Sequence, residues 1–413
     1  MRPTEPCRRA RPPQRPRRVS TGEGAPLGWP RGPGMGITVR WGGIEDLDAH
    51  TYAAWSELGE RAREATPFLM PQFIVPAARW LSPRPLRVAL FQRGRELVGV
   101  GCFSAERPNP FAPVPHLLAY CTLHSFRTGL LVAPDEADGV AHALLAATRY
   151  GPLRGHAIAL RAVPEDDDGF AALRRAACDA GGAWRELSRF ARPILHLAPD
   201  TTAVDGISHK LLKSLRRHRR RLAEQAPYSS RLVRAGPELR AATERHLSLE
   251  HHGWKGERGS SMLSCPASTA FFRELVERFD AIGAVVFSEV LAGDEVVGSS
   301  SNLLVGRTLS AFKIGWHPAR ARYSPGLLTE LALLESIETT WPHVEKFDSN
   351  AAQDSYLSQM LPHSEAIVSG FVATGRTGRL ALGAGRVAHP FARALGLQPW
   401  HVPRPGRLTL PQA

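Results

Sequence analysis

Several features that favour phosphate binding lie in one short segment, Trp316 to Gly326. Ser324 is a residue type that caps helices, Pro325 suits the first helical position, and Gly326 leaves the backbone uncovered. The free N–H groups and the dipole of a helix N-terminus attract phosphate, and two arginines precede this one. We predict a phosphate-binding strand–helix junction here, although a simple helix start is the alternative. The expected cofactor-binding residues are Arg320, Arg322, Tyr323, Ser324, Gly326, Leu327 and, from the preceding strand, Lys313.

A second group of candidates lies near the middle of the chain. Glu250, His251 and His252 precede a glycine, followed by Trp254 and Lys255. Histidine changes charge near neutral pH, so His252 with Glu250 is a candidate general base. Two adjacent histidines in a loop are also often solvated, and this alternative stays open. Trp254 and Lys255 are candidates for an acceptor site or for a structural role.

The charge of the chain is concentrated near its two ends. Its 413 residues carry a formal net charge of +13, with eight arginines against two acids in residues 1–34. Residues 376–413 add six arginines and no acid, so residues 35–375 are close to neutral. A body that binds nucleic acid would carry a basic face of its own, so nucleic acid is not the expected partner.

The composition excludes several other classes of protein. The chain is 43% hydrophobic, and no apolar run approaches the roughly 20 residues of a membrane span. The five cysteines form no C-x-x-C pair and no spacing typical of metal ligands, so we expect reduced thiols and no metal. These features, and the absence of an apolar stretch behind the arginine pair at 8–9, favour a cytoplasmic protein.

The elements that must position these candidates alternate between strands and helices. Hydrophobic periodicity predicts both kinds of element in each half of the chain. Helices are expected at 45–64, 136–149, 168–180, 209–222, 267–280 and 325–339, and strands at 37–41, 86–91, 96–103, 129–133, 157–162, 284–291, 295–304, 309–316 and 344–348.

The two halves repeat one plan. The hairpin sequence from Gly94 to Gly99 matches that from Gly293 to Gly298, and a strand–loop–helix unit follows each. We predict an α/β (α+β) fold of two tandem modules, each a mixed, mainly antiparallel sheet with flanking helices. The expected division is a disordered tail at 1–34, a first module at 35–200, a second module at 201–375 and a basic C-terminal tail at 376–413.

The junction in the first half differs from its counterpart in charge. Its sequence, from Leu131 to Asp138, places three carboxylates where the second half has arginines. Carboxylates repel phosphate, so we expect cofactor binding in the second module alone. The first module then serves as a scaffold or as a platform for the acceptor.

The order of motifs in the second half resembles a known family. The basic helix 209–222 is followed by Glu250-His-His-Gly-Trp-Lys-Gly256, then by Phe271-Phe272, Lys313-Ile-Gly-Trp316 and Tyr323-Ser-Pro-Gly-Leu-Leu328. This order is similar to the CelD/BcsL-type acetyltransferases of the GNAT superfamily, whose members carry two GNAT-like modules like the FemAB transferases. The resemblance spans about residues 37–375. It departs after Phe347-Asp-Ser-Asn350, where relatives often have an Asp-Phe-x-x-Gly segment and a Tyr-Lys pair.

The resemblance implies direct acyl transfer from acetyl-CoA or another acyl-CoA, which lies in a V-shaped split of the second module. It implies a polysaccharide, cell-envelope or small-metabolite acceptor. Tyr356 is then a candidate donor of the thiolate's proton, because GNAT enzymes often have a tyrosine in that region. Asp348 would lie beside the split and accept or orient the acceptor's proton. A packed aromatic and a turn residue are the corresponding alternatives.

Two other functions stay open at this level. A FemAB-like ligase would take its acyl group from aminoacyl-tRNA, and a non-catalytic binding module would keep the fold without turnover. The helix 209–222 carries seven Lys and Arg residues and is expected to have a solvated basic face. That face, or the tails, would suit contact with a membrane surface or with an anionic acceptor. The oligomeric state is not indicated by the sequence.

Overall fold

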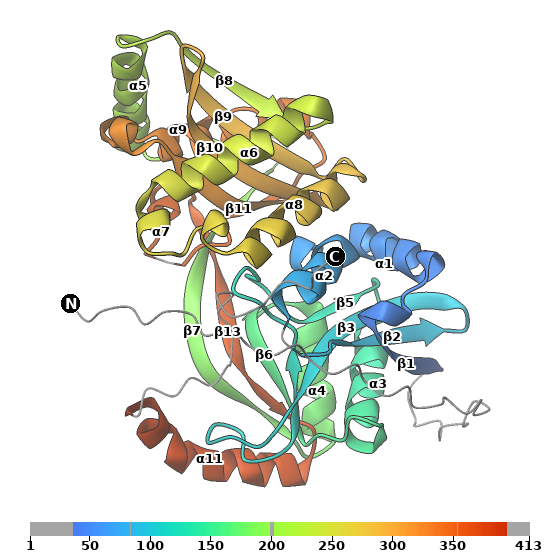
Figure 1. The fold of residues 1–413 in the computed structure, drawn as a ribbon. Coiled ribbons are helices and arrows are strands. Elements are labelled where there is room, and N and C mark those ends of the chain that lie inside the picture. Colours follow the sequence, from blue (N-terminus) through green and yellow to red (C-terminus); the bar gives the residue numbers. More distant parts are fainter. Residues whose placement is uncertain (1–35, 83, 199–201, 353, 395–413) are drawn as a thin grey trace, which may run out of the picture. The chain divides into compact units, whose positions relative to one another are not determined.

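A computed structural model of the chain describes residues 36–82, 84–198, 202–352 and 354–394 (Figure 1). The strands are β1 Ile37–Gly43, β2 Arg87–Arg93, β3 Glu96–Glu106, β4 His116–Ala119, β5 Leu130–Val132, β6 Ala157–Pro164, β7 Ala183–His196, β8 Tyr228–Val233, β9 Val285–Ala292, β10 Glu295–Val305, β11 Thr308–Trp316, β12 Lys346–Asp348 and β13 His363–Ala373.

Helices of two kinds connect these strands. The α-helices are α1 Ala49–Arg61, α2 Pro71–Leu81, α3 Ala137–Tyr150, α4 Asp168–Asp179, α5 His209–Ala223, α6 Gly236–His252, α7 Trp254–Glu257, α8 Pro266–Asp280, α9 Pro325–Leu334, α10 Ile337–Thr340 and α11 Arg376–Ala394. Short 3-10 helices are η1 Ile44–Asp46, η2 Pro67–Leu69, η3 Met262–Ser264, η4 Pro318–Tyr323 and η5 Tyr356–Gln359. None of these described helices combines the length and the apolar character that crossing a bilayer requires.

The strands form one mixed sheet. Its order is β1-β2-β3-β4-β6-β13-β7-β12-β11-β10-β9-β8, and β5 pairs with β3 beside this path. The β4–β6 and β11–β12 pairs are parallel, and the other described pairs are antiparallel. The predicted mixed α/β fold with a mainly antiparallel sheet and flanking helices is therefore confirmed.

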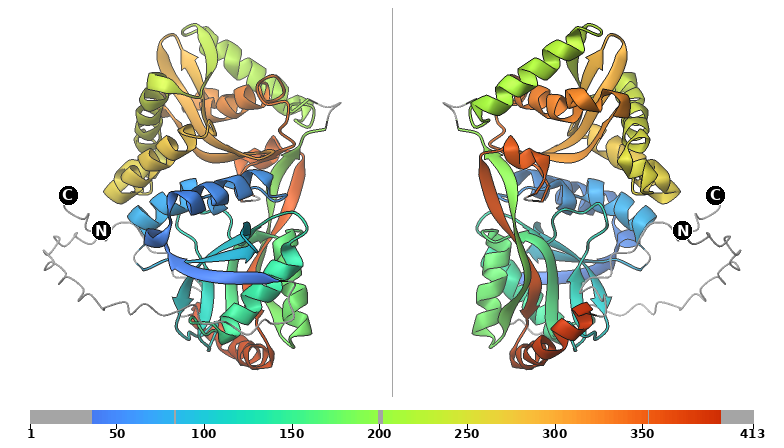
Figure 2. Two further views of the ribbon diagram at one scale, coloured as in Figure 1. Left: turned by 90° about the vertical axis from the view of Figure 1, so that its right-hand side faces the viewer. Right: turned by 90° about the vertical axis from the view of Figure 1, so that its left-hand side faces the viewer.

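Two strands join the halves of this sheet. β7 pairs along most of its length with β13, and its last residues pair with β12. β13 in turn pairs with β6, so a strand from near the end of the chain is inserted into the sheet of the first half. Figure 1 and Figure 2 show β7 and β13 running side by side. The predicted module boundaries at 200 and 375 stay a prediction: β13 lies within the predicted second module, yet it pairs with β6 and β7 of the predicted first module.

Two hydrophobic clusters cover opposite faces of β9, whose alternate residues point to opposite sides. The main core includes Phe287 of β9 together with Phe271 and Phe272 of α8 and residues of the first half. The second cluster, called here the α9 core, includes Val286 of β9 together with Leu328 and Leu331 of α9 and buried leucines of α5. Helices α6 and α8 therefore lie on one face of this part of the sheet, and α9 on the other.

The expected hairpins and most helices are confirmed, and the differences have local causes. The helix expected at 45–64 spans only Ala49–Arg61, and that expected at 325–339 is interrupted between α9 and α10. Several elements were not predicted, namely helices α2, α6, α7 and α11 and strands β4, β7, β8 and β13. Helix α2 lies in a segment read as irregular because of its prolines, yet one of them occupies the first helical turn, where proline is tolerated. The basic segment 376–413 begins with helix α11.

Candidate functional site

Strands β11 and β12 separate after a short parallel pairing. Thr308–Ser310 pairs with Lys346–Asp348, and β11 then continues to Trp316 without a described strand beside it on that side. A strand edge that lacks a partner strand exposes N–H and C=O groups to a ligand. We call this opening the β11–β12 split.

Side chains satisfy two of the carbonyls along this open edge. The Asn350 amide nitrogen donates to the Ala311 carbonyl at 2.8 Å, at the point where the strands part. Farther along, the Lys255 ammonium donates to the Ile314 carbonyl at 2.9 Å. Asn350 and Lys255 therefore mark two points along the open edge of β11.

A β-bulge in β11 changes which face its side chains occupy. Ser301 of β10 lies opposite Lys313 and Asn302 opposite Ala311, so Phe312 is the extra residue. Ala311 packs in the α9 core, whereas Phe312 packs in the main core. Lys313 lies over the Phe312 ring, on the side of the main core. The bulge therefore directs Lys313 away from α9.

The predicted strand–helix junction exists, with η4 inserted between β11 and α9. Ser324 is the N-cap residue of α9 in the left-handed conformation, with φ 52°, and its side chain makes no capping bond. Pro325 occupies the first turn, as predicted. The uncapped helix end and its dipole keep the capacity to bind an anion.

Gly326 also has a packing role that the sequence did not indicate. A Cβ atom placed there would lie 3.1 Å from Cε3 of Trp316 and 3.4 Å from Cδ1 of Ile314. The glycine therefore lets α9 pack closely on β11. The role expected for Gly326 in cofactor binding stays a prediction beside this packing constraint.

The other junction residues differ in the exposure and the contacts of their side chains. Arg320 forms an ion pair with Glu295 at 3.0 Å, whereas Arg322 is exposed and stacks over the ring of Tyr323. Tyr323 is buried in the α9 core, and Leu327 is partly buried against it. Arg322 is therefore the residue of this loop best placed to meet an anion from solvent.

The basic helix α5 lies beside this junction. It contacts η4 and α9, and the His218 ring hydrogen-bonds the backbone of Tyr323. Leu215 and Leu222 are buried, whereas all seven Lys and Arg residues of the helix are exposed. Periodicity predicted the solvated basic face, and the tertiary contacts place that face next to the candidate phosphate loop.

Tyr356 lies against the α9 core, near a buried carboxyl group. Burial, and secondarily the charge of Glu330, raise the pKa of Tyr356 well above its ordinary value. Glu330 on α9 is 2% exposed, and its Oε2 has no hydrogen-bond partner among the described residues. Burial raises the pKa of Glu330 to about 8. Tyr356 is thus protonated at neutral pH, as a proton donor must be.

Glu330→Gln is expected to change how stability depends on pH. The folded-state pKa of about 8 lies above the unfolded value of 4.5, so the folded state loses stability as pH rises between these values. The glutamine variant lacks this loss and should gain roughly 3 kcal/mol over the wild type between pH 5 and pH 8. Urea unfolding of both proteins at these pH values measures it, and an equal fall in both would contradict the assignment.

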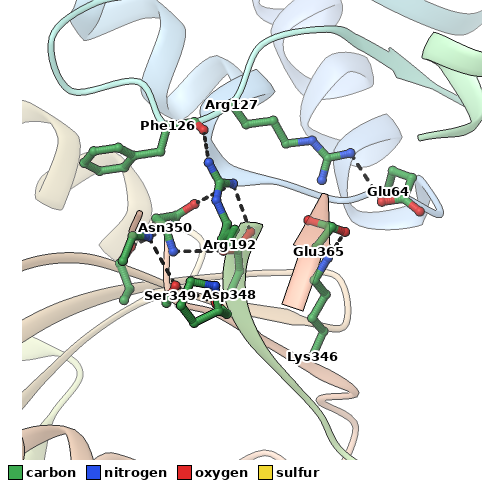
Figure 3. A network of polar contacts seen from close by, with 12 residues as sticks. Glu64, Phe126, Arg127, Arg192, Lys346, Asp348, Ser349, Asn350 and Glu365 are labelled. Atoms are coloured by element: carbon green, nitrogen blue, oxygen red, sulfur yellow. Dashed lines mark hydrogen bonds and ion pairs between the residues drawn. The ribbon is translucent and has the colours of Figure 1, made fainter. Parts of the chain in front are cut away.

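Asp348 belongs to a buried polar network beside the split (Figure 3). Arg192 is 2% exposed, and its Nη1 lies 3.5 Å from Oδ2 of Asp348 and 3.4 Å from Oδ1 of Asn350. Its Nη2 donates to the carbonyl of Phe126 at 2.5 Å. The Asn350 N–H donates to Oδ1 of Asp348 at 2.8 Å, with Asn350 at φ 51°. These contacts occupy the Asp348 carboxylate, which favours a structural role.

Glu250 and His252 do not form the expected dyad. Glu250 is buried, where Oε1 accepts from Lys255 at 3.0 Å and Oε2 from the Met262 N–H at 2.9 Å. Burial alone would raise its pKa, but the charges of Lys255 and Lys313 bring that pKa below its ordinary value. His252 is exposed and contacts Ser248 at 3.2 Å. Both residues lie in the last turn of α6, where neighbours two positions apart face different ways.

The two remaining candidates, Trp254 and Lys255, both lie in α7. Trp254 begins this helix, and its side chain lies outside the described structure. Lys255 bridges Glu250 to the open edge of β11, so its structural alternative is supported by two hydrogen bonds.

Lys313 has a partner that the sequence did not suggest. Its Nζ lies 3.2 Å from Nδ1 of His124, a residue 189 positions earlier in the chain. The expected contact of Lys313 with a cofactor stays a prediction. A second histidine, His246 on α6, is fully buried, with Nδ1 3.0 Å from the Ser299 hydroxyl. No local signal marks either histidine, because both acquire their neighbours only through folding.

The corresponding opening in the first half is filled by the chain itself. Strands β4 and β6 pair over His116–Leu118 and Ala157–Ala159 and then part. Beyond this point, Thr128 Oγ1 donates to the Arg161 carbonyl at 2.6 Å and accepts from the Arg161 N–H at 2.9 Å. The segment 120–129 therefore occupies the place that is open in the second half.

A pocket beside the first-half junction is lined by carboxylates. Glu64, Asp135, Asp167 and Asp168 contribute to its wall, next to the starts of α3 and α4. Asp167 is tied to buried Arg127 at 2.5 Å. Of the three carboxylates predicted at this junction, Asp135 lines the pocket, whereas Glu136 and Asp138 form ion pairs with Arg93 and Arg175.

Comparison with known proteins identifies part of the chain. Residues 209–356 match the family model of an acetyltransferase (GNAT) domain. The fold resembles a conserved protein of unknown function from Bacteroides thetaiotaomicron VPI-5482, at 10% identity and a TM-score of 0.52 over 79% of this chain and 98% of that one. It also resembles FemX, at 10% identity and a TM-score of 0.51 over 84% of this chain and 98% of that one.

A tandem GNAT protein from the clavulanic acid biosynthesis pathway aligns with 82% of this chain and 99% of its own length, at 16% identity and a TM-score of 0.42. No curated protein matches the chain. The structural likenesses concern the fold, whereas the acetyltransferase model covers the residues that form the β11–β12 split and its junction.

Proposed function

We propose that this chain is an acyl-CoA-dependent N- or O-acyltransferase that transfers the acyl group directly. The observation that carries the proposal is the position of an uncapped helix start, at Ser324, directly after a strand with an open edge. The pyrophosphate of CoA binds at the start of α9, and the positive charge of Arg322 compensates the negative charge of the pyrophosphate. The pantetheine arm then lies along the open edge of β11 within the split.

The chemistry at the split needs few groups. The nucleophile of the acceptor attacks the thioester carbonyl, and backbone N–H groups of β11 stabilise the oxyanion. Tyr356 donates its proton to the departing thiolate. Asp348 acts indirectly: with Arg192 it holds Asn350, whose amide caps the Ala311 carbonyl where the strands part.

The two halves divide the work in this proposal. Residues 201–375 hold the donor, and residues 35–200 hold no CoA, because their split is filled and their junction is acidic. The resemblance to the CelD/BcsL-type acetyltransferases suggests a polysaccharide, cell-envelope or small-metabolite acceptor in the cytoplasm.

Aminoacyl-tRNA is the competing donor. The fold of FemX and the exposed basic face of α5 beside the junction favour it. A tRNA donor would make binding steeply dependent on salt, whereas CoA makes few phosphate contacts.

Acetyl-CoA is expected to raise the melting temperature of the full chain by several degrees. A ligand that binds only the native state at about 100 times its Kd stabilises it by about 2.7 kcal/mol. Arg322→Glu should reduce this shift strongly because it reverses the charge at the junction. Arg154→Glu, at an exposed position of the first half, is the matched control and should retain it. No shift with acetyl-CoA or CoA in the wild type would refute the proposal, and a shift with aminoacyl-tRNA alone would favour the competing donor.

A further inference from the structure

The segment 120–129 links the first half of the chain to the candidate site of the second. It fills the first-half opening through Thr128, and it carries His124 to the main-core side of β11. There Nδ1 of His124 lies 3.2 Å from Nζ of Lys313, and Nε2 lies 3.3 Å from the Ser268 hydroxyl on α8. The His124 ring stacks on Phe271 at 5.7 Å, so its orientation is set from three directions.

Lys313 is held in an unusual environment for an ammonium group. Its Nζ lies 5.0 Å from the centre of the Phe126 ring and 5.1 Å from that of Phe312. Burial lowers the pKa of Lys313 to about 8, the charge of Glu250 opposes this, and that of Lys255 adds to it. Lys313 nevertheless keeps part of its surface exposed, whereas Glu250 is buried.

The histidines around this lysine are neutral. Burial lowers the pKa of His124 well below its ordinary value, and the charges of Lys313 and Lys255 lower it further. Burial also lowers the pKa of His246 to about 4, on the neighbouring helix α6. A neutral His124 can accept a hydrogen bond from the Lys313 ammonium through Nδ1 while donating to Ser268 through Nε2.

We propose that Lys313 is the base that takes the proton from the incoming nucleophile, and that His124 of the first half is the residue that positions it. This inference rests on the proposed acyl transfer. The neutral amine of Lys313 removes the proton of the acceptor's N–H or O–H group. At the same time, the lone pair of that acceptor nitrogen or oxygen forms a bond to the thioester carbon. The C–S bond then breaks, and the thiolate takes a proton from Tyr356. Lys313 then releases its proton to solvent, and Tyr356 takes up a proton from solvent.

The geometry favours Lys313 over the other candidates. The β-bulge turns it to the face opposite the α9 core, against which Tyr356 packs, so acid and base approach the split from opposite sides. Glu250 is occupied by Lys255 and the Met262 N–H, and His252 points into solvent elsewhere. His246 is fully buried behind Phe272.

Thiol release from acetyl-CoA, with a panel of amines, amino sugars and sugars as acceptors, tests the assignment. Lys313→Arg keeps the positive charge but cannot accept a proton, so turnover should fall by about 100-fold or more while the acetyl-CoA melting shift is retained. Lys346→Arg, which alters a lysine paired with Glu365 outside the split, is the matched control and should keep wild-type turnover. Wild-type turnover in Lys313→Arg would overturn the inference alone. No acetyl-CoA binding or turnover in the wild type would overturn the proposed function, and this inference with it.

The role of His124 has a separate readout. In the wild type kcat/KM should rise with pH through the pKa of Lys313. His124→Phe removes the hydrogen-bond acceptor of the ammonium, which favours the neutral amine, so this rise should move to lower pH as the maximum falls. His124→Asn keeps an acceptor and should restore much of the rate. The chain contains only five lysines, so an NMR titration of lysine labelled with ¹³C at Cε can follow Lys313 directly, with Lys313→Arg identifying its signal. An unchanged Lys313 titration and pH profile in His124→Phe would remove His124 from the proposal.

Discussion

Tyr356→Phe is expected to lower kcat for acyl transfer by about 100-fold while leaving the acetyl-CoA melting shift unchanged. The physical reason is the leaving group, because the thiolate needs a proton and the phenylalanine ring has none to give. Burial and the nearby charge of Glu330 keep the pKa of Tyr356 well above its ordinary value, so the wild-type tyrosine retains its proton over the whole working range. Steady-state thiol release from acetyl-CoA measures the effect.

Tyr228→Phe is the matched control for this substitution. Tyr228 is another partly buried tyrosine that packs against the α9 core, and burial likewise raises its pKa. Arg219 lies over its ring, and β8, the strand of Tyr228, is separated from β11 in the sheet by β10 and β9. We expect near wild-type kcat in this variant. Equal losses of kcat in both variants would show that Tyr356 acts only through packing.

Asp348→Asn is expected to lower the free energy of unfolding by about 3 kcal/mol. The substitution leaves the guanidinium of Arg192, which is 2% exposed, without its carboxylate partner. Loss of one member of a buried ion pair costs more than the pair contributes, because the remaining charge stays desolvated. Urea unfolding measures the change, with Asp354→Asn at an exposed site of the same region as the control.

The double variant Arg192→Met with Asp348→Asn separates structure from chemistry. It removes both charges, so it should be more stable than the sum of the two single changes implies. If Asp348 were a base, no change at Arg192 would recover turnover lost in Asp348→Asn. If the double variant recovers both stability and acyl transfer, the structural role of Asp348 is supported. If it recovers stability alone, Asp348 is again a candidate base.

The sequence was informative wherever function depends on neighbours in the chain. Ser324 and Pro325 identified the start of α9, and the glycines at 94 and 293 identified the two hairpins. The acidic first-half junction was also legible, because charge does not depend on the fold. Such local signals predicted the fold class and the strand–helix junction, whereas phosphate binding at that junction stays a prediction.

Tertiary structure alone decided how the candidate residues combine. Arg192, which comes from a strand that the sequence did not reveal, contacts the Asp348 carboxylate and favours a structural role for it. The fold brings Lys313 into contact with His124, which lies 189 positions earlier in the chain. A one-residue bulge in β11 determines the face of the sheet on which Lys313 lies. The pairing of β7 with β13 places a strand from late in the chain next to the strands of the first half. These contacts depend on the packing of buried surface between distant parts of the chain, which the local pattern of residue types does not encode. Caps, turns and hairpins depend on backbone preferences, which that local pattern does encode.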